Sequence, residues 1–167
     1  MDDHIKTGMK QLANRSDHKC FGCGPANAHG LRMKFFSDDK FVFSWVKVPD
    51  HLGGWDNLVH GGILSTMLDE IMSWSAIHLL KKMILTKSMT IDFIKPVYEG
   101  TELKIEGNVF EKKSDRQAVM EGRIYNEEGV LCTESKGIYV LFEPKVAKRL
   151  NMMSAKALKD FEPRLKA

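Results

Sequence analysis

The stretch HGGILSTMLDEIMSWSAIHLLKKM, residues 60–83, contains no proline, and apolar side chains occupy most faces of a helix drawn through it. That pattern is typical of a helix buried on nearly every side, and it predicts one long central helix from Gly62 to about Met83. The glycines at its start leave the first N–H groups of the helix open to a ligand oxygen. Inside the apolar run, the carboxylate of Asp69 needs either a hydrogen-bonding partner or a chemical task. Together these features suggest a site that polarises a carbonyl group.

The segments on both sides of this helix alternate apolar and polar residues with a period of two, as half-buried strands do. Before the helix, residues 31–36 and 41–48 predict a hairpin, because turn-forming residues separate them. After it, an antiparallel meander of four strands is predicted at about 88–94, 103–109, 117–125 and 130–142. About six strands can cover the helix on most sides only if the sheet is strongly curved. We therefore expect an α+β fold, with a curved antiparallel sheet wrapped around one long helix.

The length of 167 residues and the hydrophobic content of 43% suit one domain with a short appendage. We expect an N-terminal segment at 1–17, the main domain at 18–143 and a basic tail at 144–167. A short helix is expected to begin near Ser154 in this tail, because serine is a good N-cap. The tail is interpreted either as a solvated helix face or as a surface that attracts an anionic ligand.

Several classes of protein are disfavoured by composition. No window reaches 18 consecutive apolar residues, and residues 1–6 lack the apolar core of a signal peptide. Three irregularly spaced cysteines, Cys20, Cys23 and Cys132, do not suit a secreted disulfide framework. We therefore expect a soluble cytoplasmic protein with no membrane insertion. Nucleic-acid binding is not expected either, because no basic motif is interleaved with aromatic residues.

A family resemblance rests on motifs in a fixed order. The sequence has CFGCG at 20–24, then VHGGI at 59–63 with Asp69 nine residues after the histidine, then KPV at 95–97. Over about residues 18–142 the chain resembles the PaaI-type acyl-CoA thioesterases of the hotdog fold, in the 4-hydroxybenzoyl-CoA thioesterase superfamily.

The resemblance implies dimers with continuous sheets and acyl-CoA sites at the subunit interface, and it leaves open whether two dimers form a tetramer. The backbone at Gly61 would polarise the thioester carbonyl, and Asp69 would act as nucleophile or general base. Thr86 would orient water or the carboxylate. No cofactor is expected. Other candidates for substrate binding are His60, Gly62, Asn57, Ser73 and Ser88.

Structural alternatives stand beside some of these candidates. His60 could instead fix the loop that presents Gly61, through a hydrogen bond that involves one ring nitrogen. Asn57 could be a turn residue with positive φ. The two serines could be small polar residues at a contact between helix and sheet.

The helix geometry separates the two central groups of the candidate site. Asp69 lies about 12 Å beyond the helix start, at about 1.5 Å of rise per residue. A catalytic contact spans about 3 Å, so Asp69 cannot reach a carbonyl held at Gly61 of its own chain. An antiparallel helix from a partner chain could supply its aspartate there, so dimerisation is predicted to be required for activity.

Glu70 and the cysteine pair receive more ordinary interpretations. Glu70 points about 100° away from Asp69 around the helix, which favours a salt bridge at an interface or surface over catalysis. Cys20 and Cys23 lie near His18 and have a metal-ligand spacing. A structural zinc needs four ligands, and no second Cys-x-x-Cys exists, so we expect no metal and a packing role for the pair.

Two further functions of the same fold remain open. One is a protein that binds acyl-CoA without hydrolysing it. The other is a hydratase or dehydratase, which needs an acid and a histidine over the acyl chain; His78 would be that histidine. The chain length and the aromatic character of the acyl group are not specified by the sequence.

Overall fold

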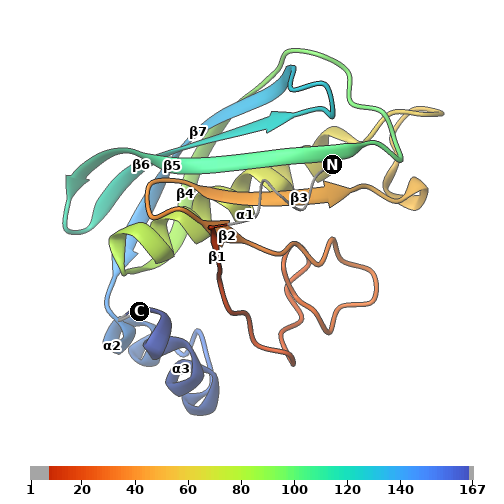
Figure 1. The fold of residues 1–167 in the computed structure, drawn as a ribbon. Coiled ribbons are helices and arrows are strands. Elements are labelled where there is room, and N and C mark those ends of the chain that lie inside the picture. The colour runs from red at the N-terminus through yellow and green to blue at the C-terminus, as the bar shows by residue number, and fades with distance from the viewer. Residues whose placement is uncertain (1–7, 166–167) are drawn as a thin grey trace.

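The computed structural model describes residues 8–165, so residues 1–7 of the expected N-terminal segment and 166–167 of the tail lie outside the described residues. Helix α1 (Gly61–Leu80) runs under a seven-stranded sheet that curls around it (Figure 1). The helix ends short of the predicted Met83 because Lys81 adopts a left-handed conformation, with φ 54° and ψ 40°. Met83 then begins a strand.

The sheet is antiparallel throughout, with strand order β1-β2-β3-β5-β6-β7-β4. Its strands are β1 (Lys10–Gln11), β2 (Phe36–Ser37), β3 (Val42–Lys47), β4 (Met83–Phe93), β5 (Glu102–Ser114), β6 (Gln117–Tyr125) and β7 (Leu131–Phe142). The predicted α+β fold, with a curved antiparallel sheet around one long helix, is confirmed.

Two details of the strands differ from the prediction. Only Phe36 of the expected strand 31–36 belongs to a strand, because the N–H groups of Leu31 and Met33 donate to the backbone of the turn at 20–24 instead. The four strands after α1 are not a meander in chain order: β4 pairs with β7, and β5 pairs with β3 and β6. As a result β4 forms one edge of the sheet.

Helix α1 packs unusually close to the middle of the sheet. Gly107 on β5 and Gly122 on β6 are register partners beneath it. A Cβ atom at Gly107 would lie 2.7 Å from Ser75 Oγ, and one at Gly122 would lie 3.2 Å from Leu68 Cδ2. Ten residues of α1 are buried, most of them apolar, as the pattern predicted.

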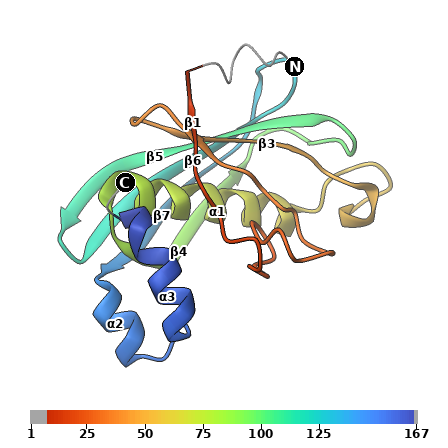
Figure 2. The same cartoon turned by 60° about the horizontal axis from the view of Figure 1, so that its bottom comes forward.

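The C-terminal residues form a helical layer beside the sheet. It contains α2 (Pro144–Arg149), α3 (Ala155–Phe161) and the 3-10 helix η3 (Glu162–Leu165) (Figure 2). Ser154 Oγ accepts a hydrogen bond from the N–H of Ala157 at 3.1 Å and so caps α3. The layer buries Ala147 and Leu158 against Met83 at the start of β4. Another 3-10 helix, η2 (Asp50–Leu52), precedes α1. None of the helices between residues 8 and 165 is long and apolar enough to cross a membrane.

Candidate active site

The carboxylate of Asp69 is the centre of a polar cluster built from α1, β4 and β7. Thr86 Oγ1 donates a hydrogen bond of 2.6 Å to Asp69 Oδ1. The hydroxyl of Tyr139 donates one of 3.0 Å to the same oxygen. Both bonds end on Oδ1, and Oδ2 accepts none from residues 8–165. Oδ2 is therefore the oxygen available for chemistry.

The pairing of β4 with β7 explains why these two hydroxyl groups meet. Thr86 and Tyr139 are register partners, so their side chains point to the same face of the sheet, toward α1. Between Thr86 and Ser88 the register of β4 shifts. Gly137 makes room for the tyrosine, because a Cβ atom there would lie 2.8 Å from Tyr139 Cε2.

Tyr139 is the residue of this cluster that the sequence analysis missed. Its side chain is fully buried. Burial, together with the charge of Asp69 and the hydrogen bond to it, raises the pKa of Tyr139 far above its ordinary value. The hydroxyl thus stays protonated and remains a donor to Asp69. The available signal was a tyrosine at an inward position of the last predicted strand, two residues after a glycine.

The start of α1 provides the second part of the site. His60 is the N-cap, and its Nδ1 accepts a hydrogen bond of 2.9 Å from the N–H of Gly62. The N–H of Gly61 donates to no residue within the described range 8–165. The ring of Phe93 lies beside it, 3.5 Å from where a Cβ atom of Gly61 would be. One backbone donor is therefore left open next to an exposed aromatic ring.

The remaining predicted residues lie around these two groups. Asn57 is exposed in the loop before α1, and its carbonyl accepts a hydrogen bond of 3.1 Å from the N–H of Glu99. The expectation of a positive φ at Asn57 is wrong, since the non-glycine residues between 8 and 165 with positive φ are Arg32, Asp39, Lys81 and Asn151. Across this turn the N–H of Gly54 donates a hydrogen bond of 2.7 Å to the carbonyl of Leu58.

Ser73 and Ser88 lie on α1 and β4 respectively. Ser73 is one helical turn beyond Asp69, and it lines a cavity of about 300 Å³ between α1, the N-terminal loop and the C-terminal helices. Ser88 is exposed immediately after the register shift in β4.

Glu70 faces away from Asp69, into the N-terminal loop. It forms no ion pair with any residue from 8 to 165, in contrast to the predicted salt bridge. Instead, Cys20 Sγ donates a hydrogen bond of 3.0 Å to Glu70 Oε1. Burial, with that hydrogen bond, raises the pKa of Glu70 to about 8. A Cβ atom at Gly22 would lie 2.3 Å from Glu70 Cγ, so the loop can pack here only with glycine.

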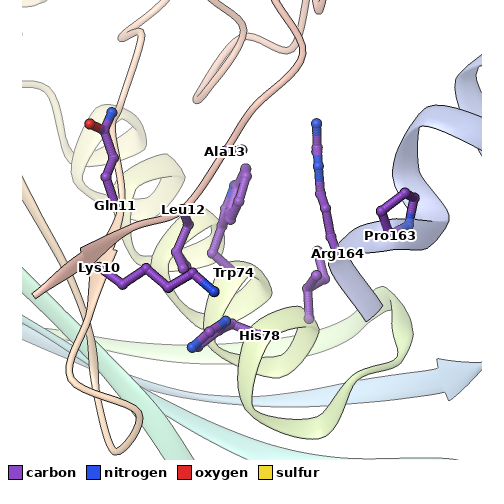
Figure 3. A pocket seen from close by; sticks show the side chains of 9 residues that line it. Lys10, Gln11, Leu12, Ala13, Trp74, His78, Pro163 and Arg164 are labelled. Atoms are coloured by element: carbon purple, nitrogen blue, oxygen red, sulfur yellow. The ribbon is translucent and has the colours of Figure 1, made fainter. Parts of the chain in front are cut away.

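A different cavity, of about 220 Å³, lies between β1, the C-terminal half of α1 and η3 (Figure 3). Its lining includes Trp74, His78 and Arg164 but not Asp69 or Thr86. His78 Nε2 lies 3.0 Å from Asp39 Oδ1. The histidine that a hydratase would need is thus engaged by another aspartate, away from Asp69.

Comparison with known proteins agrees with the resemblance seen in the sequence. The family model of the thioesterase superfamily matches residues 56–133. The PaaI protein of the phenylacetic acid degradation operon of E. coli has a TM-score of 0.62 at 19% identity, over 71% of this chain and 85% of that one. A hypothetical thioesterase from Streptococcus pneumoniae TIGR4, solved with coenzyme A, has a TM-score of 0.58 at 23% identity, over 62% of this chain and 80% of that one. Smu.793 from Streptococcus mutans UA159, bound to acetyl CoA, has a TM-score of 0.61 at 19% identity, over 66% of this chain and 88% of that one. No curated protein sequence matches significantly.

Proposed function

We propose that this hotdog-fold member of the thioesterase superfamily hydrolyses an acyl-CoA thioester to the free acid and CoA, with Asp69 as its catalytic carboxylate. The observation that carries the proposal is the Asp69 cluster. Two hydroxyl groups hold one carboxylate oxygen, which leaves the other free to act on water or on the thioester.

The chemistry follows from the charge that develops on the substrate. As a nucleophile attacks the thioester carbon, negative charge grows on the carbonyl oxygen, and the N–H of Gly61 with the helix dipole would stabilise it. In one route Asp69 Oδ2 takes a proton from the attacking water, the C–S bond breaks, and the CoA thiolate receives that proton. In the other route Oδ2 attacks the carbon itself, the C–S bond breaks and the CoA thiolate leaves. Water then hydrolyses the resulting anhydride to the free acid and the Asp69 carboxylate, and the proton that water gives up goes to the thiolate. Both routes use the same free oxygen.

The proposed site is composite and needs two chains. Asp69 lies about 12 Å along α1 from Gly61, which exceeds the reach of a catalytic contact. Among residues 8–165, strand β4 is the last strand at one edge of the sheet, and it carries exposed apolar side chains, with Leu85 47% and Phe93 56% exposed. Such an edge suits pairing with a second copy of the chain. In the resulting homodimer, Gly61 of one subunit and Asp69 of the other would act on one substrate, next to His60, Gly62, Asn57, Ser73 and Ser88. We further propose a cytoplasmic location, which the irregular set of three cysteines favours.

The substitution Asp69→Asn tests the proposal directly. It keeps the size and most of the hydrogen bonding of the side chain but removes its basicity. Against a panel of short, long and aromatic acyl-CoAs, we expect thiol release from the best substrate to fall at least about a hundredfold. Melting temperature and native mass should stay as in the wild type. Asp115→Asn, in a surface ion pair with Lys112, is the matched control and should leave turnover unchanged.

Near-normal turnover by the Asp69→Asn protein would overturn the assignment. A wild-type protein that binds acyl-CoA tightly but releases no thiol over hours would instead indicate a binding protein of the same fold.

A further inference from the structure

A second cluster of reactive side chains lies around Glu70, which points about 100° away from Asp69 around α1. The Sγ atoms of Cys20 and Cys23 and a carboxylate oxygen of Glu70 lie within 4.8 Å of one another. His18 Nδ1 lies 3.9 Å from Cys23 Sγ. A tetrahedral zinc ion, about 2.3 Å from sulfur and about 2.0 Å from nitrogen or oxygen, separates its ligand atoms by about 3.3 to 3.8 Å. The spacing of the two sulfur atoms and the carboxylate oxygen is near that geometry, and His18 Nδ1 lies at about ligand distance from one of the sulfur atoms.

The backbone holds the two thiols in place through a tight turn. The N–H of Gly24 donates to the carbonyl of Cys20 at 2.9 Å, and the N–H of Ala26 donates to the carbonyl of His18 at 3.0 Å. Gly22, in the middle of the turn, lies directly on the side chain of Glu70. The turn therefore presents both sulfur atoms to a carboxylate that comes from a distant part of the chain.

We propose that Cys20, Cys23 and Glu70 bind a zinc ion, with His18 as the fourth ligand. Two thiolates with one nitrogen and one oxygen ligand form a donor set that suits zinc better than magnesium or calcium. With four protein ligands the site is closed, which is the arrangement of a structural ion rather than a catalytic one. Two thiolates and one carboxylate would leave a net charge of −1 around the ion, and Arg164 lines the same cavity.

The ion would link the N-terminal loop to α1 at the residue that follows Asp69. Its role would be to fix this loop, and the turn of α1 beneath it, without taking part in hydrolysis. The inference does not depend on the proposed function, because its test measures metal binding alone.

Metal content and cobalt substitution test the site. Protein purified without chelators and incubated with Zn²⁺ should retain about one zinc per chain after desalting. Co²⁺ in its place should give the charge-transfer absorption of a cobalt–thiolate complex and the visible bands of a tetrahedral ion, and equimolar Zn²⁺ should remove both. Cys20→Ser and Cys23→Ser should abolish the charge-transfer band. Glu70→Gln and His18→Ala should weaken Co²⁺ binding by more than about tenfold, since even second-shell partners contribute ten- to hundredfold.

Matched controls come from the same chain. Cys132→Ala removes the remaining cysteine, Asp69→Asn alters the neighbouring carboxylate, and His29→Ala alters another histidine of the loop; all three should keep the cobalt spectrum. If the cysteine variants do not fold, the Cys132→Ala protein still decides the question, because any thiolate band in it must come from Cys20 or Cys23. A wild-type protein with no cobalt–thiolate band after reduction, or a band that survives in the Cys20→Ser and Cys23→Ser proteins, would overturn the proposal.

Discussion

Asp69 and Tyr139 show how one contact from a buried side chain can orient a carboxylate. The tyrosine hydroxyl can only donate to the carboxylate, because burial keeps it protonated. Together with Thr86 it orients Asp69 so that Oδ2 stays free. Tyr139 is thus a positioning residue in the proposed mechanism, acting through Asp69 rather than on the substrate.

Removal of the tyrosine hydroxyl by Tyr139→Phe should lower kcat/KM by about ten- to a hundredfold, since a hydrogen bond to a charged group contributes about 1.5 to 3 kcal/mol. The ring still fills its space, so the fold should persist. Because the pKa of Tyr139 is raised far above its ordinary value, its ionisation should not cause the alkaline limb of the rate profile. The profiles of wild type and variant should therefore share that limb.

Tyr125→Phe is the matched control for this prediction. The Tyr125 hydroxyl donates to Glu106 Oε1 at 2.8 Å, on β6 and β5 and outside the Asp69 cluster. Steady-state kinetics should not change. Equal losses in both variants would mean that Tyr139 contributes only general stability.

Gly61 allows the proposed N–H donor to be removed without a change of fold. Proline is well suited to the first position of a helix, and the extended conformation of His60 accommodates a following proline. Gly61→Pro should therefore melt like the wild type but lose about a hundred- to a thousandfold in kcat, as when an oxyanion donor is removed.

Gly61→Ala keeps the N–H and places its Cβ atom in ordinary contact with Phe93. It should retain most of the wild-type kcat. If the alanine and proline variants lose the same activity, the cause is crowding at Gly61 and not the missing donor.

At the scale of the element, the start of α1 depends on one side chain. His60 caps the helix through Nδ1, which accepts from Gly62. The sequence suggested such a structural role, in which His60 fixes the loop that presents Gly61. Because Nδ1 already accepts this hydrogen bond, it cannot accept one from a substrate.

His60→Ala should lower the melting temperature by about 2 to 4 °C, because loss of an N-cap costs about 1 kcal/mol in a domain of this size. Asparagine is also a good N-cap, so His60→Asn should keep both stability and turnover close to those of the wild type. Differential scanning calorimetry and thiol-release kinetics measure the two effects. Stability close to that of the wild type with turnover lost would show that the imidazole itself takes part in the chemistry.

Strand β4 is the element that determines the place of the site in the molecule. One of its sides bonds to β7, and this pairing carries Thr86 to Asp69. On the other side no strand of the described part of the chain pairs with it. A strand that contacts Asp69 on one side and lies at the sheet edge on the other can place Asp69 close to a second chain that pairs with that edge. The composite site proposed above uses this property.

At the scale of the whole molecule, the composite site predicts that two inactive chains can restore one active dimer. Asp69→Asn and Gly61→Pro proteins should be mixed, dissociated and reassembled. Each mixed dimer then combines an intact Gly61 from one chain with an intact Asp69 from the other. Recovery should approach about a quarter of the wild-type rate, since about half of the dimers are mixed and each has one intact site.

Sites contained within single chains would show no recovery in this experiment, because every chain carries a defect. Native mass spectrometry of the mixture provides the control, since it measures the fraction of mixed dimers independently of activity. A protein that remains monomeric at assay concentration but is fully active would exclude the composite site.

Local patterns in the sequence determined much of this protein. The apolar periodicity of α1 and the alternation along β3, β5, β6 and β7 predicted the secondary structure, because each reports which face of a segment is buried. The spacing from Gly61 to Asp69 predicts that the two residues lie too far apart to act together within one chain, because helical rise converts sequence separation into distance.

Only the tertiary structure decided which distant segments meet. It placed β4 beside β7, and so brought Tyr139 to Asp69 across 70 positions of the chain. It also placed the thiol of Cys20 on Glu70, 50 positions away, whereas the sequence suggested a salt bridge of Glu70 at an interface or surface. The physical reason is that periodicity specifies a buried face but not its neighbour, which depends on how all the side chains of the core pack together.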